Sequence, residues 1–181
     1  FCDRVFATAP EITFENRHQI WAAVAAQARR IPPTLIYARA QNNNHLLSEA
    51  AGLYAAGLYL PDHPEAKRWR DLGWKWLNWG FQNQINEFGA YIQYSANYQR
   101  LMLQLALFTD HLRRTAEEPD WPEETRFRLA QATRWLWALT DPETGKTPNL
   151  GANDGAYIFP LAGLPYHDFR PVAEAAGKAF L

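Results

Sequence analysis

Residues 69–81 read WRDLGWKWLNWGF, and this stretch decides the fold class of the chain. Its apolar residues recur at helical spacing in two stripes. One stripe is Trp69, Leu72, Trp76 and Trp79, and the other is Trp74, Leu77 and Phe81. A helix that is apolar on two sides is usually buried between neighbouring elements. The stretch therefore predicts a buried helix, which we expect to begin near Pro64 and to reach about Gln84.

Outward from this helix, the same spacing of apolar residues predicts five further helices. We expect them at residues 12–30, 45–60, 95–114, 123–139 and 169–181. Pro32-Pro33 ends the first of these, and residues 35–40 are expected to form a short extended or turn segment. No strand-like alternation of useful length appears. We therefore predict an all-α fold of about six helices paired as antiparallel hairpins, which stack into a bundle, a solenoid or part of an incomplete α/α toroid.

The composition bounds the class of protein. A chain of 181 residues forms one domain or a piece of a larger one, and its hydrophobic content of 48% is typical of a globular protein. The 18 basic and 19 acidic residues give a net charge of −1, which provides no electrostatic footprint for nucleic acid. No apolar run reaches the roughly 18 residues needed to span a membrane. The chain begins at Phe1 without a methionine or a signal peptide, so we expect a mature form or an excised piece.

Three asparagines and a histidine, Asn42-Asn43-Asn44-His45, stand where the helix of residues 45–60 is expected to begin. A helix N-terminus carries a partial positive charge and free N–H donors, so an amide and an imidazole there could bind an anion such as a carboxylate. Glu49 follows His45 by one helical turn and is expected to face the imidazole, orienting it or raising its pKa. The alternative is that one of the asparagines simply caps the helix.

A second polar cluster, SANYQR at residues 95–100, opens the helix of residues 95–114, with Ser95 as the expected N-cap. Tyr98 could act as an acid or a base if Arg100 lowers its pKa from the usual value of about 10, and the alternative is that Tyr98 packs in the core. The chain between Asn44 and Tyr98 leaves room for one helix out and one helix back. We therefore expect the two helix N-termini to face one cavity, where an amide, an imidazole and a phenol could transfer protons without a metal.

The segment of residues 141–164 is the longest non-helical stretch and contains a third cluster, PNLGANDG at residues 148–155. Asn153, Asp154 and Gly155 can form an Asx-type turn, and contact with a substrate is an equal alternative to a loop held by its own hydrogen bonds. The cluster is not a P-loop, because it lacks Gly-Lys-Ser/Thr. The histidines outside the first cluster show no metal-ligand spacing, so we expect neither a metal nor a cofactor.

Taken together, the three clusters resemble those of the heparinase II/III-like polysaccharide lyases. The resemblance covers residues 41–161, through Asn43-Asn44-His45 with Glu49, then residues 89–100, then residues 151–161. It implies that residues 1–181 are a single helical domain, a fragment of an incomplete α/α toroid that family members join to a β-sandwich domain. It also implies cleavage of uronic-acid-containing polysaccharides by β-elimination, in the periplasm or outside the cell.

The resemblance implies roles for individual residues. Asn44 is similar to the amide that binds and neutralises the uronate carboxylate, which acidifies the C5 proton. Tyr98 is similar to the general acid that protonates the leaving glycosidic oxygen, and in some relatives the same tyrosine is also the base. His45 is similar to a histidine that is a base in some members and a binding residue in others. The residues expected to contact the substrate are Asn43, Glu49, Gln93, Arg100, Asn153 and Asp154.

The chain departs from the family pattern at two positions, which bear on the substrate class. Gln99 stands where many members carry histidine, and Gln93 stands where many carry glutamate. No stretch reads as the β-sandwich, so we expect that missing domain to be a partner and the isolated chain to be inactive. Two other functions stay open, an α/α-barrel glycoside hydrolase using two of Glu49, Glu87 and Asp154, and a scaffold of helical hairpins that binds a peptide or protein.

Overall fold

The computed structural model describes residues 13–181, within which seven α-helices and no strand are present. The helices are α2 (Phe14–Ala28), α3 (Ile31–Gln41), α4 (Asn44–Tyr59), α5 (Ala66–Gln84), α6 (Ala96–Thr115), α7 (Glu123–Leu139) and α8 (Arg170–Phe180). The prediction of an all-α fold is confirmed, and the arrangement is consistent with part of an α/α toroid. The predicted start of the first helix, at residue 12, lies outside the described residues. No helix in the described range is both long enough and apolar enough to cross a bilayer.

One helix of the structure contradicts a prediction. α3 occupies residues 35–40, which were expected to be extended or a turn, and it brings the helices of residues 13–181 to seven rather than about six. Pro32 and Pro33 do follow the end of α2, but they also form the first turn of α3. A proline costs nothing there, because the first N–H groups of a helix have no intrahelical partner. Leu35 and Ala38 are then buried on the inner side of α3.

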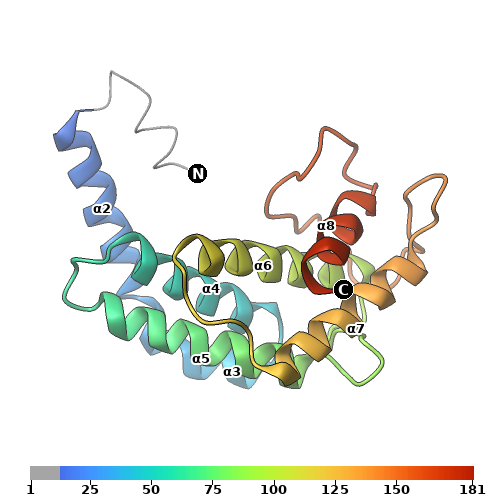
Figure 1. Cartoon of the computed structure of the whole chain (residues 1–181), viewed down its shortest axis with the longest axis horizontal. Helices are drawn as coiled ribbons and strands as arrows, with labels where there is room; N and C mark the ends of the chain where they lie inside the picture. Colours follow the sequence, from blue (N-terminus) through green and yellow to red (C-terminus); the bar gives the residue numbers. More distant parts are fainter. Residues whose placement is uncertain (1–12) are drawn as a thin grey trace.

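α5 is buried on two sides, as its sequence predicted. The stripe of Trp69, Leu72, Trp76 and Trp79 packs into a hydrophobic core shared by α2, α3, α4 and α5. The stripe of Trp74, Leu77 and Phe81 packs into a second core, which α5 shares with α4, α6, α7 and α8. α5 therefore joins the two halves of the molecule, and Figure 1 shows it running along the base of the helical layer in this view.

α4 packs more extensively against α5 than against any other helix. Two glycines allow the close approach of the two backbones. A Cβ atom on Gly57 would lie 2.6 Å from the carbonyl oxygen of Ala66, and a Cβ atom on Gly73 would lie 2.5 Å from the backbone nitrogen of Tyr54. Gly57 on α4 and Gly73 on α5 therefore let the two helices approach each other closely.

The start of α4, the end of α5 and the start of α6 meet at one end of the molecule. Gln84, at the end of α5, donates from Nε2 to the carbonyl oxygen of Asn43 at 3.1 Å. Gln93, just before α6, accepts at Oε1 from the backbone N–H of Asn44 at 3.1 Å. Figure 1 shows α8 and the long non-helical segment toward this end, with α2 at the opposite end. The two polar helix N-termini are therefore neighbours.

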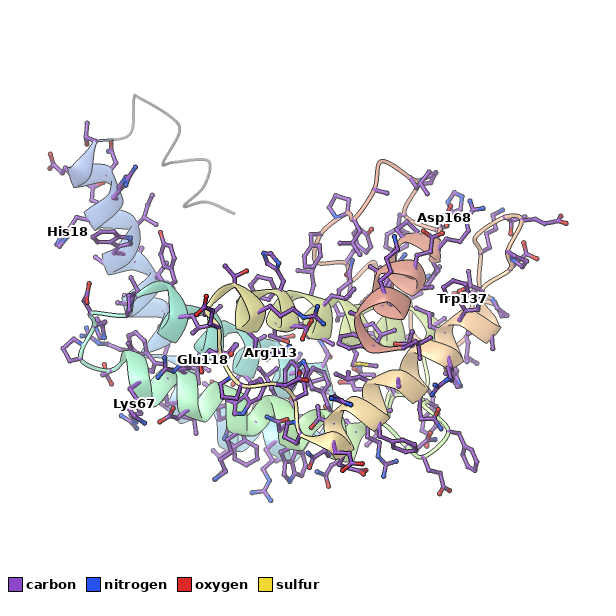
Figure 2. All side chains as sticks on the ribbon, in the orientation of Figure 1. His18, Lys67, Arg113, Glu118, Trp137 and Asp168 are labelled. Atoms are coloured by element: carbon purple, nitrogen blue, oxygen red, sulfur yellow. The ribbon has the colours of Figure 1, made fainter. Side chains whose placement is uncertain are left out.

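The connection between α6 and α7 is held by a buried polar cluster. Asp110 accepts at Oδ1 from Arg113 Nη2 and from Trp121 Nε1, each at 2.9 Å. The indole of Trp121 stacks on that of Trp74 with 4.3 Å between ring centroids, which ties the connection to α5. Figure 2 labels Arg113 in the last turn of α6 and Glu118 on the connection, and the Glu118 backbone N–H donates to the Arg113 carbonyl at 2.9 Å.

Candidate functional site

Two of the three asparagines at the start of α4 have structural roles. Asn42 ends α3 in the left-handed conformation, with φ of 49°, and its side chain accepts a hydrogen bond from Gln84 Nε2 at 3.2 Å. Asn43 is the N-cap of α4, and its Oδ1 accepts from the backbone N–H of His45 at 3.0 Å. The half-buried side chain of Asn44 makes no hydrogen bond to any of residues 13–181. The amide of Asn44 is therefore the one that is free to bind a ligand.

His45 is exposed on the first turn of α4. Its Nδ1 atom lies 2.8 Å from Oε1 of Gln41, and for this amide orientation Nδ1 carries the proton while Nε2 keeps its lone pair. Glu49 does not orient the imidazole, because its carboxylate accepts a hydrogen bond from the hydroxyl of Thr34 at 2.9 Å. The expected pairing of Glu49 with His45 is thus replaced by the pairing of His45 with Gln41.

The third sequence cluster lies directly on the start of α6. Ser95 caps α6 by accepting from the backbone N–H of Tyr98 at 3.2 Å, and its hydroxyl donates to the carbonyl of Ala152 at 2.5 Å. The backbone N–H of Ala96 donates to the carbonyl of Leu150 at 3.0 Å. The segments 95–100 and 148–155 are therefore parts of one site, although they are far apart in the sequence.

Tyr98 is paired with a carboxylate. Its hydroxyl donates to Oδ2 of Asp154 at 2.5 Å. This hydrogen bond, together with burial and the charge of the carboxylate, raises the pKa of Tyr98. The same bond lowers the pKa of Asp154. The expectation that Arg100 lowers the pKa of Tyr98 is therefore wrong in direction, because the partner of the phenol is an anion rather than a cation.

Arg100 lies beneath the long non-helical segment and is 0% exposed. Its guanidinium carbon is 4.7, 4.3 and 4.1 Å from the ring centroids of Tyr157, Tyr166 and Phe169. It donates to the carbonyl oxygen of Tyr166 and, at 2.8 Å, to Oδ1 of Asn97. No carboxylate pairs with it in the part of the chain that the structure describes, and burial lowers its pKa. Aromatic rings cover the guanidinium of Arg100 in this structure. Direct contact of Arg100 with a substrate therefore stays a prediction.

Asn97 and Tyr166 belong to the same site and were not singled out from the sequence. The Tyr166 hydroxyl lies 2.7 Å from Oδ1 of Asn97 and 2.9 Å from Oδ1 of Asn153, so the predicted binding residue Asn153 is held next to α6. Asn97 stands inside the polar cluster of residues 95–100, which is a signal that could have identified it. Tyr166 stands in an irregular segment without a motif, and no signal in the sequence marks it.

Gln93 and Gln99 have structural partners. Gln93 accepts from the backbone N–H of Asn44, as described above, and so connects the start of α4 to the start of α6. Gln99 is buried and donates from Nε2 to the carbonyl oxygens of Gly89 at 2.9 Å and Ala132 at 3.1 Å. Gln99 therefore faces the core, away from the exposed Asp154 that Tyr98 contacts.

Two surface hollows lie away from this site. One hollow lies between α7 and α8, where Trp137 and Lys178 line it, and another lies along α5 beside Lys67. Figure 2 labels Trp137 and Lys67 at these places. Among residues 13–181, no group of three or more His, Cys, Asp or Glu side chains is placed to hold a metal ion. That Asn44, His45 and Tyr98 share one cavity stays a prediction, and the contact that joins the two helix N-termini directly is the one between Asn44 and Gln93.

Comparison with known proteins gives one match. Residues 3–155 match the family model described as Heparinase II/III N-terminus. This range contains all three polar clusters and the helices α2 to α7, whereas α8 lies beyond it. No curated protein and no solved structure matches the chain significantly.

Proposed function

Because the chain belongs to the heparinase II/III N-terminal family, we propose that it is the helical part of a lyase that cleaves uronic-acid-containing polysaccharides by β-elimination. The observation that carries this proposal is the meeting of two helix N-termini at one end of the fold, one bearing the free amide of Asn44 and the other bearing Tyr98. The partial positive charge at the N-terminus of α4, where the Asn44 amide is free, favours an acidic substrate there.

The proposed reaction assigns one role to each of three residues. Asn44 binds the uronate carboxylate and, with the N-terminus of α4, stabilises the negative charge that develops when the C5 proton leaves. His45 is a candidate base, because Nε2 keeps its lone pair when Nδ1 donates to Gln41. The electron pair of the C5–H bond forms the C4–C5 double bond, and the C4–O bond breaks. The leaving oxygen takes the hydroxyl proton of Tyr98.

The proposed function includes a further domain and a location. We expect a β-sandwich domain to complete the cleft over this end of the fold, as the resemblance implies, and we expect the isolated chain to have little activity. The protein is expected to act in the periplasm or outside the cell, where acidic polysaccharides occur. The contacts add no support for a glycoside hydrolase, because Asp154 and Glu49 accept hydrogen bonds from the hydroxyls of Tyr98 and Thr34 in different parts of the fold.

A direct test uses the full-length protein that contains this chain. It is incubated with heparan, alginate and other uronides, and the ultraviolet absorbance of an unsaturated product is followed. We expect activity on at least one uronide, and Tyr98→Phe should lower kcat by about 10²–10⁴-fold, because the proton donor is lost.

The matched control is Tyr59→Phe, which also removes a phenol hydroxyl. Tyr59 is the last residue of α4, so it lies far from the two helix N-termini. The control variant should keep the activity of the unchanged protein. Full activity of the Tyr98→Phe protein, or the absence of an unsaturated product with every uronide, would contradict the proposed function.

A further inference from the structure

Asp154 is held over the first turn of α6 by the loop that carries it. Two hydrogen bonds fix this loop next to Asp154, from Ser95 Oγ to the Ala152 carbonyl at 2.5 Å and from the Ala96 N–H to the Leu150 carbonyl at 3.0 Å. The carboxylate itself is oriented by its neighbour, since Oδ1 accepts from the backbone N–H of Ala156 at 3.1 Å. Oδ2 then points at the Tyr98 hydroxyl at 2.5 Å.

Within residues 13–181, the phenol of Tyr98 is the side chain that hydrogen-bonds to this carboxylate. No arginine, lysine or histidine of the described chain forms an ion pair with Asp154, although ten such pairs occur elsewhere in residues 13–181. Arg100, the nearest cation in sequence to Tyr98, is enclosed by aromatic rings instead. Asp154 is thus a solvent-exposed carboxylate that accepts a hydrogen bond from the hydroxyl of Tyr98 and forms no ion pair within residues 13–181.

We propose that Asp154 is the positioning residue of Tyr98, whose carboxylate orients the phenol O–H and restricts Tyr98 to the role of proton donor. The role of Tyr98 as a proton donor rests on the proposed function. The orientation of its hydroxyl by Asp154 rests on the observed contacts alone. A tyrosine can serve as a base only after it has lost its proton, and an adjacent carboxylate opposes that loss because two negative charges would face each other. The base of the elimination is therefore a group other than Tyr98.

The charges around the phenol support this assignment. The hydrogen bond to Asp154 is the largest cause of the raised pKa of Tyr98, followed by burial and by the charge of Asp154. The phenol of Tyr91 is the other titratable group that interacts with Tyr98 within residues 13–181. Because burial raises the pKa of Tyr91 above its ordinary value of about 10, Tyr91 is neutral near pH 7 and adds no charge. Asp154 is the charged group that sets the protonation of Tyr98.

The proton balance of the step is complete without a further reactant. The base takes the C5 proton, and the Tyr98 hydroxyl leaves Asp154 and gives its proton to the leaving oxygen. The resulting phenolate faces the carboxylate, and repulsion between the two favours rapid return of a proton through solvent from the protonated base. The enzyme regains its starting state, and the polysaccharide becomes two chains, one of them unsaturated.

Nuclear magnetic resonance of the full-length protein with ¹³Cζ-labelled tyrosine tests the proposal without any substrate. The Tyr98 signal is assigned by its loss in Tyr98→Phe, and its titration is recorded for the unchanged protein, Asp154→Asn and Asp141→Asn. In Asp154→Asn the pKa of Tyr98 should fall toward its ordinary value of about 10. Asp141→Asn removes one charge from the same non-helical segment and should leave the Tyr98 titration unchanged, because Asp141 pairs with Thr144.

Hydrogen exchange of the Ala96 amide reports whether the loop stays docked in Asp154→Asn. A fall in the pKa of Tyr98 with the amide still protected supports the proposal. An unchanged pKa, or a fall that accompanies loss of that protection, overturns it.

The lyase assay then separates this inference from the proposed function. If the protein is a lyase, the alkaline limb of the kcat profile should move to lower pH in Asp154→Asn, as the Tyr98 pKa falls. If no uronide is cleaved, the proposed function fails, while the titration result for Tyr98 and Asp154 stands on its own.

Discussion

At the scale of single residues, Gly151 allows the loop of residues 148–155 to lie directly on the start of α6. Its φ of +69° belongs to the left-handed region, and a Cβ atom would lie 2.3 Å from the carbonyl oxygen of Tyr94. Both the backbone conformation and the space therefore require glycine. The contact between Tyr98 and Asp154 depends on this close approach, because Asp154 follows Gly151 in the same loop.

Gly151→Ala should release the loop from α6. A left-handed conformation costs an ordinary residue about 1–2 kcal/mol, and the clash with Tyr94 adds to this cost. Hydrogen exchange should show loss of protection at the Ala96 amide, which donates to Leu150 in the docked loop. The matched control is Gly155→Ala, which has a similar φ of +81° but open space around its Cβ atom, and it should keep that protection. Equal protection in the two variants would contradict the role given to Gly151.

At the scale of elements, the N-cap side chains of α4 and α6 differ in the hydrogen bonds that they make. The side chain of Asn43 accepts one hydrogen bond, from the backbone of its own helix. Ser95 is buried, caps α6 and also donates to the carbonyl of Ala152 in a distant loop. The capping side chain of α6 therefore also holds a distant loop, whereas the side chain of Asn43 makes the capping bond of α4 and the tertiary contacts there come from Gln84 and Gln93.

Ser95→Ala should destabilise the protein more than Asn43→Ala does. Loss of a cap costs about 1 kcal/mol of the free energy of unfolding, and loss of the second hydrogen bond adds about 0.5–1.5 kcal/mol. Urea unfolding of the two variants, followed by circular dichroism, measures this difference. A larger loss of stability in Asn43→Ala would show that the contact between Ser95 and Ala152 contributes nothing.

The helices themselves were predictable to different degrees. α5 was predicted well because its two stripes follow the 3.6-residue period, which depends only on residues a few positions apart. α3 was missed because Pro32-Pro33 was interpreted as a stop signal alone, although two prolines also fit the first turn of a new helix. Only the burial of Leu35 and Ala38 against the neighbouring helices decides between the two interpretations.

At the scale of the whole molecule, three carboxylates hold the connection between α7 and α8, through bonds within it and to α6 and α8. Asp168, which is labelled in Figure 2, forms an ion pair with Arg170 at 2.6 Å, and this bond lowers its pKa. Hydrogen bonds from Thr144 lower the pKa of Asp141, and the Tyr98 hydroxyl lowers that of Asp154. All three carboxyl groups stand between α7 and α8, and the pKa of each is lowered in the folded protein. The stability of this connection should therefore fall as the three groups become protonated.

This segment should undock before the helices unfold when the pH is lowered. The folded pKa of each carboxyl lies below its unfolded value of about 3.9, so the stabilisation is complete above that value and is lost as the pH falls through the folded pKa. Hydrogen exchange between about pH 5 and pH 2.5 should show protection lost at the amides of Ala96 and Phe169, which donate to this segment, while amides in α5 stay protected. Simultaneous loss at all of these amides would contradict this prediction.

The site was predicted in its parts but not in its contacts. The sequence alone determined the all-α fold, most of the helices and the polar clusters that contain Asn44, Tyr98 and Asp154, because helical periodicity, capping residues and turn residues act over a few neighbouring positions. The tertiary structure alone decided that Tyr98 meets Asp154 and that Arg100 is enclosed by aromatic rings. The paired residues Tyr98 and Asp154 are 56 positions apart, and a pairing at that distance is set by how the chain packs as a whole.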